Sequence, residues 1–217
     1  MRPGLFITLE GIDGSGKSTQ IRQLVRHLRK SGRRVLVTRE PGGTRIGERI
    51  RAILLPASTG KLAALAELAL MYAARAQHLE EVVRPALKRG EIVVSDRYND
   101  ASFAYQGFGR KLGVQTVQAF DDIICGATQP DLTVVLDLNP GQALERAQGR
   151  EARRRSSPGR FEAQGLQFYR RVRAGYLALA RRAPARMKVV RADQPAAKIR
   201  NEIRAIVEKM LVSRAKK

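Results

Sequence analysis

The stretch from Gly11 to Ser18 is the part of this chain whose residue types most plainly specify a chemistry. It reads Gly-Ile-Asp-Gly-Ser-Gly-Lys-Ser and matches the phosphate-binding pattern GxxxxGK[ST] at every fixed position. Glycines let a backbone curl around phosphate, the Lys17 ammonium can reach the outer phosphates, and the Ser18 hydroxyl can bind Mg²⁺. The pattern predicts a nucleoside triphosphate site made of Gly11, Ile12, Asp13, Gly14, Ser15, Gly16, Lys17, Ser18 and Thr19.

The segments on either side of this loop have the character that such a site needs. The run Leu5–Leu9 is typical of a short buried strand, and apolar residues recur at helical spacing beyond the loop, at Ile21, Leu24, Val25 and Leu28. The N-terminus of a helix presents free N–H groups and partial positive charge to an anion. These flanks argue against the alternative of a chance glycine-rich turn.

Strand-like apolar runs alternate with helical patterns along the whole chain. The runs cover Leu5–Leu9, Val35–Thr38, Ile92–Ser95, Leu132–Leu138 and Met187–Val190. Helical patterns cover about 17–31, 44–55, 62–89, 99–107, 114–126, 140–149, 161–183 and 195–213. This alternation predicts an α/β fold of three layers, with a parallel sheet of five strands and helices on both faces.

Unusual polar groups follow three of the predicted strands. They are Gly11–Ser18 after the first strand, Arg39-Glu40-Pro41 after the second and Asp96-Arg97-Tyr98 after the third. Ligands of parallel sheets gather at the carboxyl ends of the strands. We therefore expect these three groups to meet at one site.

Composition narrows the class of protein further. The 217 residues are 43% hydrophobic, which favours a single domain with a full core. There is no apolar run of about 18 residues, there is little room for a signal peptide before Leu5, and Cys125 is the lone cysteine. We expect a cytoplasmic protein without a membrane span.

The net charge of +21 raises the question of nucleic-acid binding. The charge is spread over the chain, and aromatic residues amount to only 5%, which leaves little material for stacking on bases. We expect no specific nucleic acid partner. A polyanionic small substrate accounts for part of the charge.

Four separated motifs carry a resemblance to a known family. They are residues 10–19, residues 38–44 (Thr-Arg-Glu-Pro-Gly-Gly-Thr), residues 72–75 (Tyr-Ala-Ala-Arg), and residues 96–98 together with 105–107 (Asp-Arg-Tyr and Tyr-Gln-Gly). With these motifs the chain resembles bacterial thymidylate kinases, which phosphorylate dTMP to dTDP. The resemblance runs from Phe6 to about Asp193. It implies a P-loop nucleoside monophosphate kinase fold, ATP and dTMP as substrates, Mg²⁺ as cofactor and a homodimer.

The resemblance also implies roles on the acceptor side. It places Arg39 and Arg97 near the 5′-phosphate of dTMP, where arginine can hold phosphate bidentately; structural ion pairs with Glu40 or Asp96 are the alternative. Asp13 is expected to accept a hydrogen bond from the 3′-hydroxyl of the sugar, or else to stabilise the turn.

For the base, the resemblance implies that Arg75 hydrogen-bonds thymine and that Gln106 reads its other polar edge. Tyr105 either lines the base pocket or belongs to the core. Met71 stands where relatives often carry a phenylalanine that stacks on thymine, and a sulfur–aromatic contact can replace that stacking.

On the donor side, Asp96 is expected to act with Ser18 in the Mg²⁺ shell, or to pair with Arg97 or Lys17. The loop carries no basic residue between Gly11 and Gly16. The resemblance therefore assigns the transition-state cation to the arginine-rich segment, which it identifies as a mobile lid at about 150–160. Its candidates, beside Lys17 and Arg97 as catalytic residues, are Arg150, Arg153 and Arg160. Gly159 stands where relatives carry an acidic residue, and a basic loop with no catalytic part is the alternative.

Two other functions remain open at this point. Met71 leaves room for a kinase acting on a different nucleoside monophosphate. The high positive charge leaves room for a P-loop ATPase stimulated by nucleic acid, although the Asp96-Arg97-Tyr98 motif argues against it. His27, His78 and Cys125 are expected to be surface or core residues and not metal ligands.

Overall fold

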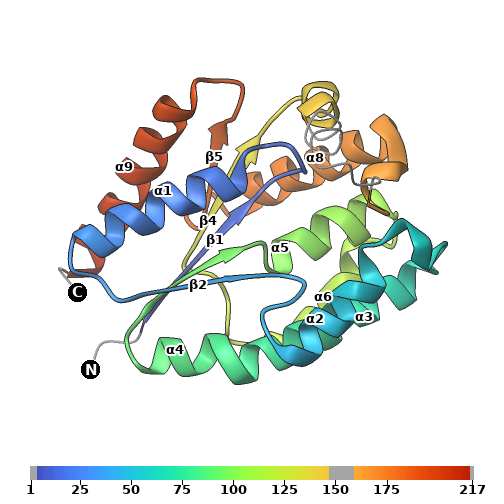
Figure 1. Cartoon of the computed structure of the whole chain (residues 1–217), viewed down its shortest axis with the longest axis horizontal. Helices are drawn as coiled ribbons and strands as arrows, with labels where there is room; N and C mark the ends of the chain where they lie inside the picture. Colours follow the sequence, from blue (N-terminus) through green and yellow to red (C-terminus); the bar gives the residue numbers. More distant parts are fainter. Residues whose placement is uncertain (1–3, 147–158, 216–217) are drawn as a thin grey trace.

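A five-stranded parallel sheet forms the centre of the computed structural model, which describes residues 4–146 and 159–215 (Figure 1). The strands stand in the order β2-β3-β1-β4-β5 and every neighbouring pair is parallel. Their bounds are β1 Leu5–Glu10, β2 Val35–Arg39, β3 Ile92–Asp96, β4 Leu132–Asp137 and β5 Met187–Arg191. The predicted fold class is confirmed, and all five predicted strands are present.

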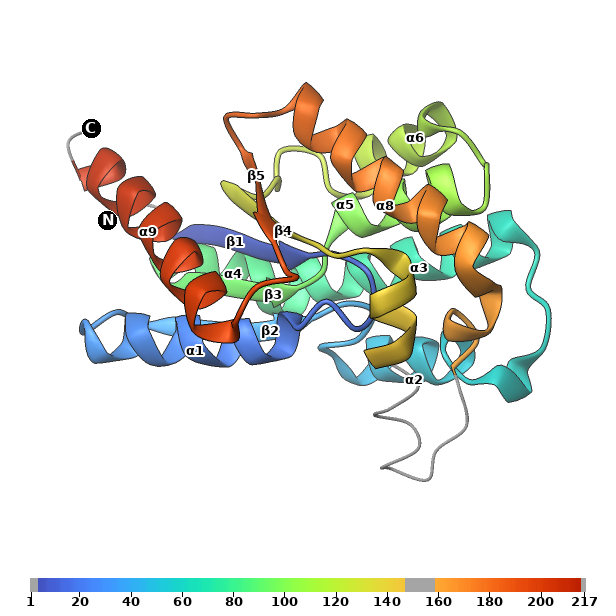
Figure 2. The same cartoon turned by 90° about the horizontal axis from the view of Figure 1, so that it is seen from above.

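Alternation of side chains along the central strand assigns helices to the two faces of the sheet. Leu5, Ile7 and Leu9 of β1 share a core with α1 (Lys17–Lys30) and α9 (Ala196–Ala215), which pack side by side on one face (Figure 2). Phe6 points to the opposite face and packs among side chains of other helices. The helices of that side include α3 Ala64–His78, α4 Arg84–Lys88, α5 Asn99–Ser102, α6 Val114–Ile124 and α8 Gly165–Arg182.

Two helical patterns that the sequence presents as continuous are interrupted by wider, π-helical turns. The 62–89 pattern divides into α3, the π-helical turn η2 (Leu79–Val83) and α4, which begins beside Pro85. Proline has no N–H to donate to the preceding turn and its ring needs space, which explains a wider turn just before it. The 99–107 pattern divides into α5 and the π-helical turn η3 (Phe103–Gly109).

Shorter helical pieces complete the chain. α2 spans Arg45–Leu54, a single 3₁₀ turn η1 spans Ala57–Thr59, and a second one, η4 (Glu162–Gln164), precedes α8 within the predicted 161–183 helix. The predicted 140–149 helix is helical over 140–146, and its remainder lies outside the described residues. Close packing joins η3 to α8, because a Cβ at Gly109 would lie 2.7 Å from the Phe168 ring.

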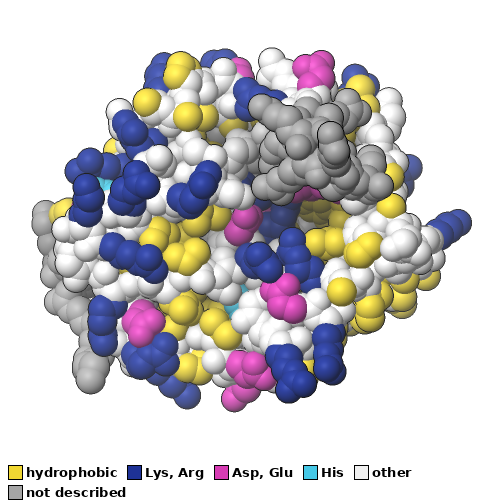
Figure 3. Space-filling view, in the orientation of Figure 1, with side chains coloured by type: hydrophobic (Ala, Val, Ile, Leu, Met, Phe, Trp, Pro, Cys, Tyr) yellow, Lys and Arg dark blue, Asp and Glu magenta, His cyan; other side chains and the backbone are white. Residues whose placement is uncertain are grey.

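Charge and hydrophobicity on the surface follow the composition. In the space-filling view, Lys and Arg side chains are spread over the visible face and are not gathered above one element (Figure 3). No helix among residues 4–146 and 159–215 has the length and apolar character needed to cross a membrane.

Candidate active site

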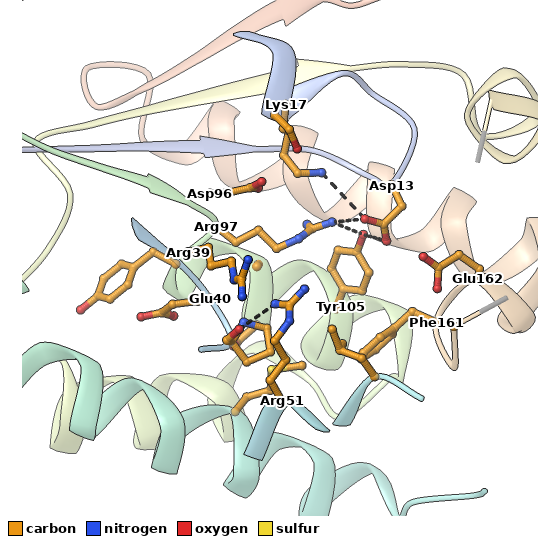
Figure 4. Close-up of a pocket in the computed structure, with 18 of the residues that line it drawn as sticks. Asp13, Lys17, Arg39, Glu40, Arg51, Asp96, Arg97, Tyr105, Phe161 and Glu162 are labelled. Atoms are coloured by element: carbon orange, nitrogen blue, oxygen red, sulfur yellow. Dashed lines mark hydrogen bonds and ion pairs between the residues drawn. The ribbon is translucent and has the colours of Figure 1, made fainter. Parts of the chain in front are cut away.

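A cavity of about 440 Å³ opens at the carboxyl ends of β1, β2 and β3. The three polar groups that follow these strands all contribute to its wall, as their positions in the sequence predict. Side chains from α3, η3 and the start of η4 complete it. Its lining includes Asp13, Lys17, Ser18, Thr19, Arg39, Arg51, Met71, Arg75, Asp96, Arg97, Tyr105, Gln106, Phe161 and Glu162 (Figure 4).

The glycine loop is held in a conformation that other residues rarely adopt. Gly14 and Gly16 have φ angles of 86° and 94°, and a Cβ on Gly14 would lie 2.2 Å from the Ala143 carbonyl oxygen. The Lys17 Nζ turns back and donates to the carbonyls of Gly11 (3.0 Å) and Ile12 (3.2 Å). Burial, together with the nearby Arg97 charge, lowers the pKa of Lys17. An anion in the loop would offset both the burial of the Lys17 ammonium and its repulsion by Arg97.

Arg97 occupies the centre of the cavity wall, between the loop and the aromatic residues of α8 and η3. Its backbone lies in the left-handed region at φ 73°, which is rare for a residue with a side chain. The guanidinium donates to Asp13 Oδ1 (2.7 Å), to the Gly11 carbonyl (2.9 Å) and to the Tyr105 hydroxyl (3.1 Å). The ion pair of Arg97 is therefore with Asp13, and neither Glu40 nor Asp96 takes that place.

Asp13 is shaped by the charges around it. Besides Arg97, it accepts from the hydroxyls of Tyr105 and Tyr169, each at 3.3 Å, and Lys17 lies 4.0 Å away. Burial by itself would raise the pKa of Asp13, but Arg97 and Lys17 outweigh it and lower the pKa to about 2. The residue is thus a carboxylate acceptor at the junction of loop and cavity.

Two further arginines face the same space from β2 and α2. Arg39 is more than half exposed and donates to both carboxylate oxygens of Glu48 at 3.1 Å, so its partner is Glu48 and not Glu40 or Asp96. Arg51 donates to the Pro41 carbonyl at 2.7 Å. Burial and the neighbouring Arg39 lower the pKa of Arg51. Repulsion between nearby cations has this effect, and a bound anion would offset it.

The far end of the cavity is built around Arg75, which is almost completely buried. Its Nε donates to Glu40 Oε2 at 2.7 Å, and its Nη2 donates to the Tyr98 carbonyl and the Ser102 hydroxyl. Nη1 has no hydrogen-bond partner among the described residues. A buried N–H donor without a partner is costly, so a ligand acceptor is the natural complement to it.

Glu40 links Arg75 to His78 at this end of the cavity. It bonds Arg75 with one carboxylate oxygen and His78 Nδ1 with the other at 2.8 Å, while His78 Nε2 contacts the Thr38 hydroxyl at 2.6 Å. Burial would raise the pKa of Glu40, but Arg75 and His78 hold it below its usual value. His78 is a buried core residue, as one of the two expected readings has it.

Gln106, Tyr105 and Met71, which the sequence predicts to bind the base, line the same cavity as Arg75. Gln106 donates from Nε2 to Glu67 at 2.7 Å, and Met71 is half-buried on α3. Tyr105 lines the cavity and also packs edge-on against Phe161 and Phe168, so it belongs both to the cavity wall and to the core.

The structure does not bring Arg160 into the cavity. Its side chain is buried, donates to Glu67 Oε2 at 2.5 Å and to the Leu54 carbonyl at 2.8 Å, and stacks over Phe161. As described, Arg160 anchors the start of the segment before α8 and does not face the phosphate loop. The other candidates, Arg150 and Arg153, lie outside the described residues.

The oxygen donors expected for Mg²⁺ are both on the cavity wall. Ser18 is exposed at the first turn of α1, and Asp96 stands at the end of β3. Mg²⁺ is commonly held by one or two protein oxygens together with water and substrate phosphates, so this small donor set fits the ion. Among residues 4–146 and 159–215, no cluster of three or more His, Cys, Asp or Glu side chains suits a metal.

Several site residues were missed from the sequence. Arg51 sits in an amphipathic helix, where an arginine reads as a solvated surface residue. In the sequence, Glu67 of α3 likewise resembles a solvated surface residue. Tyr169 and Tyr176 lie about 60 to 70 residues beyond the last motif, and only the packing of α8 on η3 brings their hydroxyls to Asp13 and Arg97.

The parallel sheet, the phosphate loop after its central strand and the facing arginines define a P-loop kinase of the nucleoside monophosphate type. Residues 9–203 match the family model described as thymidylate kinase. The chain therefore belongs to the thymidylate kinase family.

Individual relatives agree with this assignment. The thymidylate kinase of Solidesulfovibrio magneticus is 46% identical, over 95% of this chain and 100% of its own length. That of Pseudomonas savastanoi pv. phaseolicola is 47% identical, over 96% and 97%. A crystal structure of the Ehrlichia chaffeensis enzyme superposes with a TM-score of 0.76 at 30% identity, covering 95% of this chain and 99% of that one.

Proposed function

We propose that the chain transfers the γ-phosphoryl group of ATP to dTMP, giving ADP and dTDP, with the two substrates entering opposite ends of the cavity. One observation supports the placement of ATP at one end of the cavity and of dTMP at the other. The cavity is continuous from the loop around Lys17 to the buried, unpartnered Nη1 of Arg75. O4 of thymine is an acceptor suited to that donor.

The phosphates are handled by the cations between these ends. ATP binds along residues 11–19, where Lys17 exchanges its two carbonyl partners for phosphate oxygens. Arg39 and Arg97 hold the 5′-phosphate of dTMP, with Arg51 beside them, and Asp13 accepts a hydrogen bond from the 3′-hydroxyl. An oxygen of the bound dTMP phosphate attacks the γ-phosphorus in line, so the reaction needs no covalent enzyme intermediate.

Ser18 and Asp96 are the residues that would hold Mg²⁺. When bound, the ion neutralises charge on the transferring phosphates. The chain's own part is to orient the two anions and to keep their charge surrounded by fixed donors, which act most strongly where water is excluded.

The segment at about 150–160 is proposed as a lid that supplies the transition-state cation. Because Arg160 is engaged with Glu67, we assign that cation to Arg150 or Arg153. A lid that closes only over bound ATP would exclude water at the moment of transfer.

We further propose a homodimer working in the cytoplasm. Large apolar side chains stand exposed on neighbouring helices of one side, among them Ile46 and Ile53 of α2 and Leu65 of α3. Light scattering coupled to size-exclusion chromatography tests this: a mass near 24.1 kDa at working concentrations would refute the dimer.

Initial rates with ATP and four acceptors test the substrate assignment. The expected order places dTMP first, ahead of dUMP, dCMP and dGMP. A higher kcat/KM for any of the other three would overturn it, and Met71 would then be the first residue to replace by phenylalanine.

A further inference from the structure

Glu67 is a fully buried carboxylate that lies behind the base end of the cavity and does not line it. It comes from the first turn of α3 and receives donors from three side chains in two other segments. Gln106 Nε2 lies 2.7 Å from Oε1, Arg110 Nη2 lies 2.9 Å from Oε2, and Arg160 Nη1 lies 2.5 Å from Oε2. The carboxylate therefore joins the π-helical turn η3 to the segment that precedes α8.

The surroundings of Glu67 keep it ionised. Burial alone would raise its pKa, but the hydrogen bonds from Arg110, Gln106 and Arg160 outweigh burial and lower the pKa below its usual value. The two guanidinium groups that contact this carboxylate also favour its ionised form. An ionised carboxylate has no hydrogen to donate, so it acts only as an acceptor.

This fixes which way the carboxamide of Gln106 faces. A carboxamide has a donor end and an acceptor end, and an acceptor-only neighbour must receive the donor end. Gln106 lines the cavity and its Nε2 is turned to Glu67, so Oε1 is the polar atom left for a ligand. No described residue donates a hydrogen bond to that oxygen.

We infer that Glu67 is a positioning residue for base selectivity, which makes the cavity accept a pyrimidine with N–H at ring position 3. This inference rests on the proposed binding of the base between Arg75 and Gln106. Thymine carries N3–H and the acceptor O4, which match the Gln106 oxygen and the Arg75 Nη1 donor. Cytosine carries a lone pair at N3 and an amino group at C4. The Gln106 oxygen would then face another acceptor, and the Arg75 N–H would face another donor.

The variant Glu67→Gln tests the inference with little change of shape. A glutamine at position 67 offers both a donor and an acceptor, so the Gln106 carboxamide can turn over and present its NH₂ to the base. The ratio of kcat/KM for dTMP to that for dCMP is expected to fall about tenfold or more. The turned carboxamide would donate to N3 of cytosine and would no longer accept from N3–H of thymine. The ratio of dTMP to dUMP stays unchanged, because uracil has the same N3–H and O4.

Arg110→Gln is the matched control. Arg110 contacts Glu67 but does not line the cavity, and Arg160 still keeps Glu67 ionised. This variant should lower Tm and leave both selectivity ratios as they are. If Glu67→Gln folds and its dTMP-to-dCMP ratio is unchanged, or if its dTMP-to-dUMP ratio falls equally, Glu67 has only a structural role.

Two further variants keep the outcome decisive. Gln106→Ala should lower the dTMP-to-dCMP ratio by itself; if it does not, the proposed placement of the base fails, whatever Glu67 does. If Glu67→Gln does not fold, Glu67→Asp withdraws the carboxylate by one methylene and should lower the ratio about threefold. An unchanged ratio in that variant would overturn the inference.

Discussion

The two ends of the cavity are built on different principles. At the proposed phosphate end, Lys17 donates to loop carbonyls, Arg97 donates to a loop carbonyl and to the partly exposed Asp13, and Arg39 donates to the half-exposed Glu48. At the base end, Arg75 is held by the buried Glu40 and Gln106 by the buried Glu67, with almost no exposure to water. The carboxylates of the first set are partly open to water, whereas those of the second set are buried.

This difference fits the role proposed for each end. Cations that follow a phosphoryl group must leave one acceptor for another, so partners that a phosphate oxygen can reach and replace serve them best. Groups that read a base must keep one orientation, because discrimination depends on which atom faces the ligand. The buried carboxylates provide that orientation, and breaking such a pair costs several kcal/mol.

The largest effect is expected from the two arginines proposed to supply the transition-state cation. Replacing Arg150 and Arg153 together by Ala should lower kcat by roughly 10³-fold, as for lost arginine fingers, with little change in Tm. Arg160→Ala should instead lower Tm, because it leaves Glu67 with one guanidinium fewer. Single-turnover rates and thermal melts separate the two. A loss of tenfold or less in the double variant would place the catalytic cation elsewhere.

Arg97→Ala tests the exchangeable end directly. We expect kcat/KM for dTMP to fall about 10- to 100-fold, through both a higher KM and a lower kcat, because a charge-assisted contact to the acceptor phosphate is lost. The KM for ATP should change much less. Arg89→Ala, which removes an exposed pair with Glu91, is the control. Equal effects on both substrates would contradict the division of the cavity into two ends.

Arg75→Lys tests the fixed end with the charge retained. Lysine lacks the planar fork that bonds Glu40, Tyr98 and Ser102 together, so Tm should fall and the KM for dTMP should rise about tenfold. Arg84→Lys, at a partly buried arginine that does not line the cavity, provides the comparison. Should the KM of dTMP stay constant while Tm falls, Arg75 would be a structural residue only.

The smallest effect concerns pH and the buried Glu10. Its pKa is raised to about 7, chiefly by burial and against the nearby Arg97 charge. The folded state therefore binds a proton that the unfolded state has released, and stability falls as pH rises from about 4.5 to 7, by on the order of 1 kcal/mol per pH unit. Glu10→Gln keeps the acceptor for the Tyr98 N–H and should flatten this decline in denaturant melts.

Asp13 gives the opposite sign at the other side of the pH range. With its pKa lowered to about 2, its contribution to stability is present above about pH 4 and is lost as pH falls toward 2. Asp13→Asn should weaken the acid limb of the stability curve without altering the limb between pH 5 and 7. A variant that shifts both limbs together would show that the two carboxyl groups titrate as one unit.

Sequence reasoning worked best where a residue type has a single use. The glycine pattern of the loop and the three polar groups after consecutive strands placed most of the cavity wall, because parallel strands present their carboxyl ends together. It failed for residues whose local context is ordinary. Arg51 and Glu67 look like surface residues of helices, and Arg160 looks like one of several interchangeable arginines.

The sequence by itself determined the class of fold, the phosphate site and the family, because local patterns and motif residues are sufficient for them. Only the tertiary structure decided the partners of the charged residues. Arg97 pairs with Asp13, Arg39 with Glu48, Arg75 with Glu40 and Arg160 with Glu67. The physical reason is that an ion pair depends on distances of a few ångströms between segments far apart in the chain, and local sequence patterns contain no such distances.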